Sequence, residues 1–305
     1  MNRLTVKSES YLKVFLALWI VIGHLPNTGW ISLMTHWAVA GFFFMSGYGL
    51  ESKREGTTAE NYRMNLFKSA KKLLIPYYIC QFVYLVGFFL PMSMTDFGIR
   101  LIREILLIDV NLPHAWYVRT QLILYVIWWA VGRLDKKWVR LLLMAVGVAA
   151  YIVLFAKTGQ LFTSYKTVFA FLAGILYKQC EDKVEKLVTN PFVAIVAACL
   201  AFQLAVIGAT RFDGDSVWSV IAMNLTGVMI CVVYIFILKK VNLGFAPIVW
   251  LAPVTYEIYL VQGIAKEIIL EVPILGPVLS FALTIILAFV LNRLINVCSK
   301  LIKRP

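Results

Sequence analysis

The sequence has little charge, few acidic residues and almost no histidine. Only 15% of its 305 residues are Asp, Glu, Lys or Arg, with 16 acids against 29 bases and three histidines. Because 61% of the residues are hydrophobic, so few charges cannot cover the surface of a soluble protein of this length. The scarcity of charge therefore excludes a soluble globular protein and indicates a chain that lies largely in a membrane.

Other patterns are missing as well. The five cysteines form no CxxC pair and lie in or beside apolar segments, which favours packing over disulfides or metal ligands. We expect no metal site and no permanently bound cofactor. With no internal repeat and no linker, residues 1–305 are interpreted as one domain without an appended soluble domain. The sequence GHLPN follows the first apolar run in place of a small-residue cleavage site, so that run is interpreted as an uncleaved helix.

Long apolar runs are what the chain does have. Windows of about 18 to 20 apolar residues recur with short polar gaps, and continuous apolar runs in lipid form helices, in which every backbone group is paired. The sequence predicts an all-α polytopic membrane protein with about ten transmembrane helices. The predicted spans are residues 10–26, 31–50, 72–92, 114–132, 138–156, 161–178, 191–209, 216–238, 246–263 and 273–298.

The basic residues gather in alternate loops. An even number of spans places both termini on one side, and all but seven of the 29 Lys and Arg residues fall on that side, which the positive-inside rule makes cytoplasmic. The net charge of +13 is therefore interpreted as orientation charge, and no nucleic-acid partner is expected. Residues 96–113 are predicted to form a helix on the outer surface, where it could cover the mouth of a site.

Lys13 and His24 share one face of the first predicted helix. Eleven residues correspond to about three helical turns and a rise of roughly 16 Å, so one elongated ligand could touch both. A histidine in a membrane helix usually faces the interior, where its neutral imidazole can accept a proton. Orientation charge for Lys13 and a structural hydrogen bond for His24 are the alternatives.

Several polar residues fall near the predicted outer boundary. His36 is a second candidate base or an acceptor contact, although its tryptophan neighbours also suit an interfacial belt. His114 and Trp116 open the fourth span, where belt and helix-start roles would explain them. Arg119 and Glu257 lie within predicted spans, where ionisable groups are functional candidates unless they pair with each other.

The cytoplasmic boundary carries its own candidates. Ser46-Gly47-Tyr48-Gly49 is interpreted as a break that either opens a cavity or forms a small-residue helix contact with a C-terminal cap. Lys68, Lys71 and Lys72 lie at the entrance of the third span, where they either bind a phosphate-bearing cytosolic ligand or fix orientation.

In this order the motifs resemble those of the membrane acyltransferase-3 family, over nearly the whole chain. Lysine stands where the family often has arginine, and Gln262 stands where relatives often have histidine, so we assign Gln262 no proton transfer. The matching segments are Lys13 to His24, Phe42-Phe43-Phe44-Met45-Ser46-Gly47-Tyr48, the lysine-rich run before Pro76, His114-Ala115-Trp116-Tyr117-Val118 and Thr255-Tyr256-Glu257-Ile258-Tyr259-Leu260.

The resemblance implies a bacterial plasma-membrane enzyme that moves an acyl group, commonly acetyl, from cytosolic acyl-CoA to a hydroxyl of a cell-surface glycan or lipid-linked sugar. His24 would be the general base and Glu257 a second catalytic candidate. The candidates for the donor site are Lys13, Lys68, Lys71, Lys72, Ser46 and Tyr48, and those for the acceptor site are His36, His114, Trp116 and Arg119.

No cysteine lies near a histidine in the sequence, which favours direct transfer over an acyl-enzyme. A transporter or flippase for a sugar, lipid or amino acid is the alternative, and a membrane partner that recruits a glycan-assembly complex is a third. The oligomeric state is left open.

Overall fold

The structure, a computed structural model, is helical throughout the part of the chain that it describes. The described residues are 6–25, 30–55, 57, 59–89, 94–110, 112–158, 164–213, 216–269 and 275–302. They form α1 (Val6–Gly23), α2 (Trp30–Glu55), α3 (Ala59–Phe89), α4 (Met94–Ile105), α5 (Trp116–Val131), α6 (Lys137–Lys157), α7 (Phe169–Val188), α8 (Pro191–Thr210), α9 (Val217–Lys240), α10 (Ala246–Leu251), the 3₁₀ turn η2 (Ala252–Val254), α11 (Thr255–Ile269) and α12 (Gly276–Ile302).

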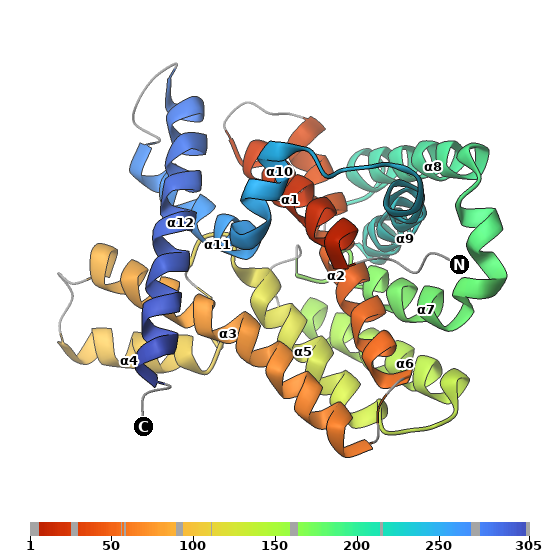
Figure 1. The fold of residues 1–305 in the computed structure, drawn as a ribbon, viewed down its shortest axis with the longest axis horizontal. Helices are drawn as coiled ribbons and strands as arrows, with labels where there is room; N and C mark the ends of the chain where they lie inside the picture. Colours follow the sequence, from red (N-terminus) through yellow and green to blue (C-terminus); the bar gives the residue numbers. More distant parts are fainter. Residues whose placement is uncertain are drawn as a thin grey trace.

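The helices gather into one bundle, with α12 and α4 at one side and α8 and α9 at the other (Figure 1). The closest pairs are α2 with α7, α8 with α9, and α11 with α12, and α1 contacts both α2 and α11. Helix α1 therefore links the α2–α7 pair to the α11–α12 pair.

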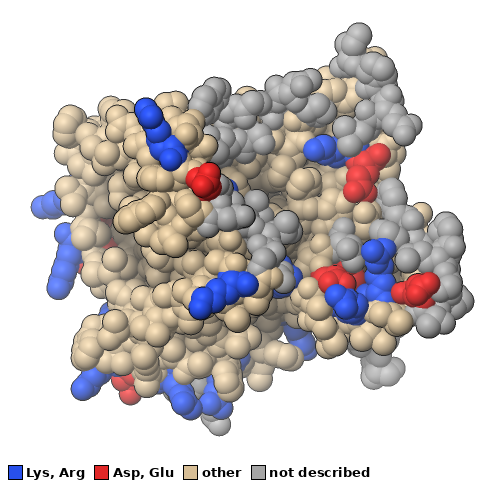
Figure 2. Space-filling view, turned by 180° about the vertical axis from the view of Figure 1, so that it is seen from behind, with Lys and Arg blue, Asp and Glu red and all other residues tan. Residues whose placement is uncertain are grey.

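The all-α prediction is confirmed for the described residues, and part of the membrane prediction is supported. Five segments of the described chain are long and apolar enough to cross a membrane, by length and composition: Lys137–Lys157, Pro191–Thr210, Val217–Lys240, Ala246–Ile269 and Gly276–Cys298. Much of the face in Figure 2 carries neither acidic nor basic side chains, as a lipid-facing surface requires. The ten spans and the cytoplasmic termini stay predictions.

The boundaries of α2 and α3 differ from the predicted ones. Helix α3 begins at Ala59, well before the predicted start at residue 72, because Tyr62, Leu66 and Leu73 bury one face of its charged first turns. Helix α2 continues to Glu55. The predicted break at Ser46–Gly49 is therefore wrong, because regular helix runs through it.

Gly47 instead marks the crossing of α2 and α7. A Cβ atom on Gly47 would lie 2.1 Å from the Phe171 carbonyl oxygen, and one on Gly174 would lie 2.1 Å from the Phe44 carbonyl oxygen. Each glycine thus meets the backbone of the other helix directly, which is how small residues bring helices together. Of the two readings of the glycine motif, this geometry favours the helix contact.

Two later spans also change. The span predicted at 246–263 is divided into α10, η2 and α11, because Pro253 lacks the N–H that would continue the helix. Helix α7 begins at Phe169 and continues to Val188, past the predicted end at residue 178. Its charged last turns are stabilised by ion pairs, since Glu181 contacts both Lys178 and Lys239 at 3.1 Å.

The predicted outer-surface helix is present as α4, but it packs against α3. Tyr77 of α3 donates to buried Glu104 at 3.3 Å, and the Tyr78 hydroxyl donates to the Ile105 carbonyl at 2.8 Å. Ile99 and Ile102 of α4 point outward and are more than half exposed. Its polar side is therefore fastened to the bundle, and its apolar side faces outward.

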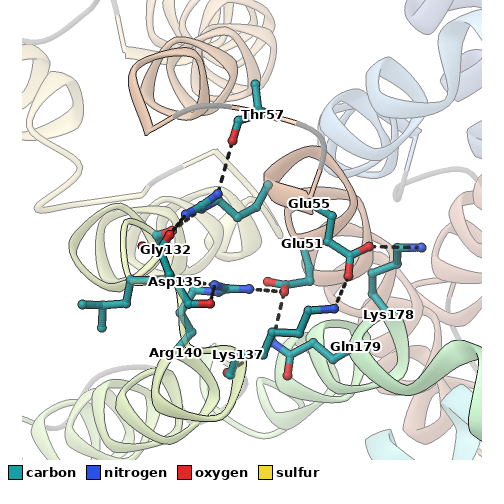
Figure 3. A network of polar contacts seen from close by, with 11 residues as sticks. Glu51, Glu55, Thr57, Gly132, Asp135, Lys137, Arg140, Lys178 and Gln179 are labelled. Atoms are coloured by element: carbon teal, nitrogen blue, oxygen red, sulfur yellow. Dashed lines mark hydrogen bonds and ion pairs between the residues drawn. The ribbon is translucent and has the colours of Figure 1, made fainter.

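A buried ion pair joins the end of α2 to the start of α6 (Figure 3). Arg140 donates through Nη2 to Glu51 Oε1, and Gln179 of α7 donates to the same oxygen at 3.1 Å. Glu51 and Arg140 are 0% and 3% exposed. Beside them, Lys137 forms a more exposed pair with Glu55 at 2.6 Å. This network holds α2, α6 and α7 together at one end of the bundle.

Candidate functional site

The motif segments, far apart in the sequence, meet in the interior of the bundle. The Tyr117 ring of α5 lies 4.9 Å from the Phe43 ring of α2 and 5.6 Å from the Tyr259 ring of α11, measured between centroids. Both contacts have the tilted or edge-to-face geometry that aromatic rings prefer. These three rings, which come from three of the five matching segments, pack together, and we call them the aromatic floor.

His24 lies in the turn directly after α1 and reaches two other segments. Its ring stacks on that of His114, with centroids 3.8 Å apart and planes 18° from parallel. Its Nδ1 atom lies 3.1 Å from Oε1 of Gln262 on α11. Three polar side chains from α1, α11 and the loop before α5 therefore form one group, which we call the histidine cluster.

Backbone geometry places His114 in this cluster. His114 has a φ of 63°, in the left-handed region that a few polar residues tolerate. Its carbonyl accepts a hydrogen bond from the Tyr259 hydroxyl. Gly263 permits the approach of the preceding turn, because a Cβ there would lie 2.8 Å from the Pro113 carbonyl oxygen. Tyr259 and Gly263 of α11 thus position the His114 ring.

Both imidazoles of the cluster are held in the neutral form. Burial has the largest effect and lowers the pKa of His24; the hydrogen bond with Gln262 raises it, and the charge of Lys266 lowers it. Burial likewise lowers the pKa of His114 to about 3, with His24 and Lys266 as further causes. Both residues lie in turns outside the helices. At neutral pH His24 is therefore able to accept a proton.

The remaining outer candidates lie around this cluster. His36 of α2 is close enough that the charges of His24 and Lys166 act on it, and its Nδ1 atom is buried with no hydrogen-bond partner among the described residues. Trp116 is the first residue of α5 and packs against the core. The histidines thus come from three segments of the chain.

Arg119 and Glu257 do not pair with each other in the described structure. Arg119 donates to the Ile108 carbonyl at 3.2 Å and lies over the Phe155 ring. The Glu257 carboxylate accepts from Asn292 of α12 at 3.0 Å. Each has a different neighbour, so the structural alternative of a mutual ion pair is wrong for these two residues. Their assignment to the site stays a prediction.

Lysines converge near the middle of α1, about three turns before His24. Lys13 lies 4.0 Å from Glu9, and the charges of Lys13 and Lys72 both act on Lys53 of α2. Lys53 also donates to Ser69 of α3 at 3.1 Å. We call Lys13, Lys53 and Lys72 the lysine cluster. It joins residues of α1, α2 and α3.

The other residues predicted to contact the acyl donor lie in different surroundings. Lys71 lies over the Phe67 ring at 4.6 Å, and Lys68 and Lys71 are exposed, as is Lys72. Ser46 is within hydrogen-bonding range of the Tyr117 and Tyr125 hydroxyls. The Tyr48 hydroxyl donates to Glu181 of α7 at 3.1 Å. Ser46 therefore borders the aromatic floor, and Tyr48 belongs to the ion network.

The sequence pointed to Gln262 without giving it a role in the site, and it did not single out Lys53. The spacing of Tyr259, Gln262 and Lys266 at i, i+3 and i+7 forms a polar stripe on an otherwise apolar helix, and it could have pointed to that face of α11. Lys53 was grouped with orientation charges, and no pattern in the sequence separates it from them.

One comparison with known proteins gives a match. A family model described as an acyltransferase domain matches residues 10–293. No significant match is found among curated proteins or among solved structures. Because the family model spans almost the whole chain, the protein belongs to the membrane acyltransferase-3 family.

Proposed function

We propose that the protein is an integral membrane O-acyltransferase that uses cytosolic acyl-CoA, with acetyl as the acyl group. The acceptor is a hydroxyl of a cell-surface glycan or a lipid-linked sugar. The observation that carries this proposal is the His24 imidazole, which is half-buried and in contact with Gln262 and His114 inside an acyltransferase domain. A neutral imidazole is the group that general-base catalysis at neutral pH requires.

In the proposed reaction, His24 takes the proton of the acceptor hydroxyl as its oxygen attacks the thioester carbonyl carbon. The carbon–sulfur bond then breaks, and the CoA thiolate leaves with the proton from the imidazolium. The new ester and free CoA are the products, so atoms and charges balance without an acyl-enzyme. Positioning the two substrates supplies much of the remaining rate enhancement.

We assign the lysine cluster to the acyl donor and the histidine cluster to the acceptor. The lysine cluster suits the phosphates of the donor, and His24 lies eleven residues from Lys13 on the same face of α1. The arm of acyl-CoA would have to reach roughly 16 Å along this helix. Ala17 and Ile20, which lie between them on that face, are buried in the bundle.

Purified protein in liposomes tests this function. Thioester consumption is expected only when acyl-CoA and a polysaccharide or lipid-linked sugar with free hydroxyls are both present, and mass spectrometry should find the new ester on the acceptor. Empty liposomes give the background rate. If acceptor crosses the bilayer without acyl-CoA and no ester forms, the protein is a transporter and the proposal is wrong.

The lysine cluster predicts how the donor binds. Lys72→Ala should raise the KM for acyl-CoA roughly tenfold, or about 1.4 kcal/mol, because a charge-assisted contact to phosphate is lost. The turnover number should change little. Lys71→Ala is the matched control, since Lys71 lies over Phe67 outside the cluster. A KM for acyl-CoA that is unchanged in Lys72→Ala would show that Lys72 only orients the chain.

A further inference from the structure

Gln262 is a buried side chain whose position packing alone does not explain. It is 3% exposed on α11, and its Oε1 atom lies 3.1 Å from Nδ1 of His24. Its Nε2 atom is buried with no hydrogen-bond partner among the described residues. An unpaired buried donor costs about 1–3 kcal/mol, so an apolar residue of this size would pack better.

The hydrogen bond between the Gln262 amide and the His24 imidazole has a defined donor and acceptor. In this orientation of the Gln262 amide, its oxygen accepts the hydrogen bond and a neutral imidazole carries one N–H, so the contact requires the proton on Nδ1. The lone pair of Nε2 is then free to take a proton. The opposite tautomer would carry its proton on Nε2 and could not serve as a base there.

The other groups that face His24 do not supply this control. His114 stacks on it from the loop before α5, Lys266 acts on it from α11, and His36 lies near it on α2. Positive charge on Lys266 or on either histidine disfavours a further proton on His24. The Gln262 oxygen is the contact that favours a proton on Nδ1.

We propose that Gln262 is a positioning residue that holds His24 in the Nδ1–H tautomer and so presents Nε2 to the acceptor hydroxyl. The proposal rests on the function proposed above.

Two substitutions at position 262 test the proposal through the pH dependence of the rate. Gln262→Glu keeps an acceptor oxygen and adds negative charge, so the acidic limb of the profile should move up by about 1–3 pH units. Gln262→Met removes the acceptor and should lower kcat by about tenfold or more, with the KM for acyl-CoA unchanged. The control is Gln203→Met, the same substitution at an exposed position of α8.

A second measurement needs no substrate. The chain has three histidines, so protein labelled with ¹⁵N-histidine gives three imidazole spectra, which His36→Gln and His114→Gln assign. We expect the Nδ1–H tautomer for His24 in the unmodified protein, a mixture in Gln262→Met, and an imidazolium that persists to higher pH in Gln262→Glu.

The outcomes are separable. The expected tautomer without acyl transfer would support the role of Gln262 and refute the proposed function. An Nε2–H tautomer in the unmodified protein would overturn the inference, and so would an unchanged kcat and pH profile in Gln262→Met.

Discussion

Replacing His24 by alanine is expected to lower the rate of acyl transfer by about 10²- to 10⁴-fold, the contribution typical of a general base. Binding of acyl-CoA should be unchanged, because Lys13 of the lysine cluster lies about three helical turns from His24. The measurement is thioester consumption under single-turnover conditions, with donor affinity from equilibrium binding.

His24→Gln serves as the second variant. Its amide can replace some hydrogen bonds of the imidazole but cannot take up a proton, so it should be as slow as His24→Ala while folding at least as well. Full turnover by either variant would remove His24 from the mechanism. A loss of donor binding in both would instead point to a structural role.

Replacing Arg140 by methionine is expected to destabilise the protein by about 3–5 kcal/mol, because Glu51 is left fully buried without its partner. Adding Glu51→Gln to this variant should restore much of the stability, since the uncompensated charge is then gone. The measurement is the free energy of unfolding in detergent micelles, with circular dichroism as the signal.

Lys137→Met is the matched control on the same helix. Lys137 pairs with Glu55, but its side chain is 52% exposed, so its loss should cost less than about 1 kcal/mol. If Arg140→Met and Lys137→Met were equally stable, burial of the Glu51–Arg140 pair would have no energetic consequence.

The sequence was sufficient for the all-α class and the family, because continuous apolar runs and the ordered motifs are local patterns. The partners of His24 could not be predicted from the sequence. His114 and Gln262 lie 90 and 238 residues away in the chain, and only the packing of α1 against α11 and the loop before α5 brings them together. A left-handed residue such as His114 has no reliable local signal.

The predicted helix boundaries were wrong where a helix continues through charged residues. Hydropathy ends a span at the first charged residues, yet α3 and α7 continue through them because Tyr62 and Leu66 bury one face and Lys178 pairs with Glu181. The three lysines before Pro76 are a similar case. Their net charge cannot distinguish Lys72 from Lys71, whereas the helix points these two neighbouring side chains in different directions.

The crossing of α2 and α7 determines which of the helices around the site can move. Gly47 and Gly174 bring backbone against backbone, so α2 cannot slide or turn on α7 without atomic overlap. In contrast, α1 is held to α11 and to the loop before α5 by the side chains of His24, Gln262 and His114, which can change rotamer. We therefore expect entry of a substrate to displace α1 more easily than it separates α2 from α7, and we expect His24, the proposed base, to move with α1.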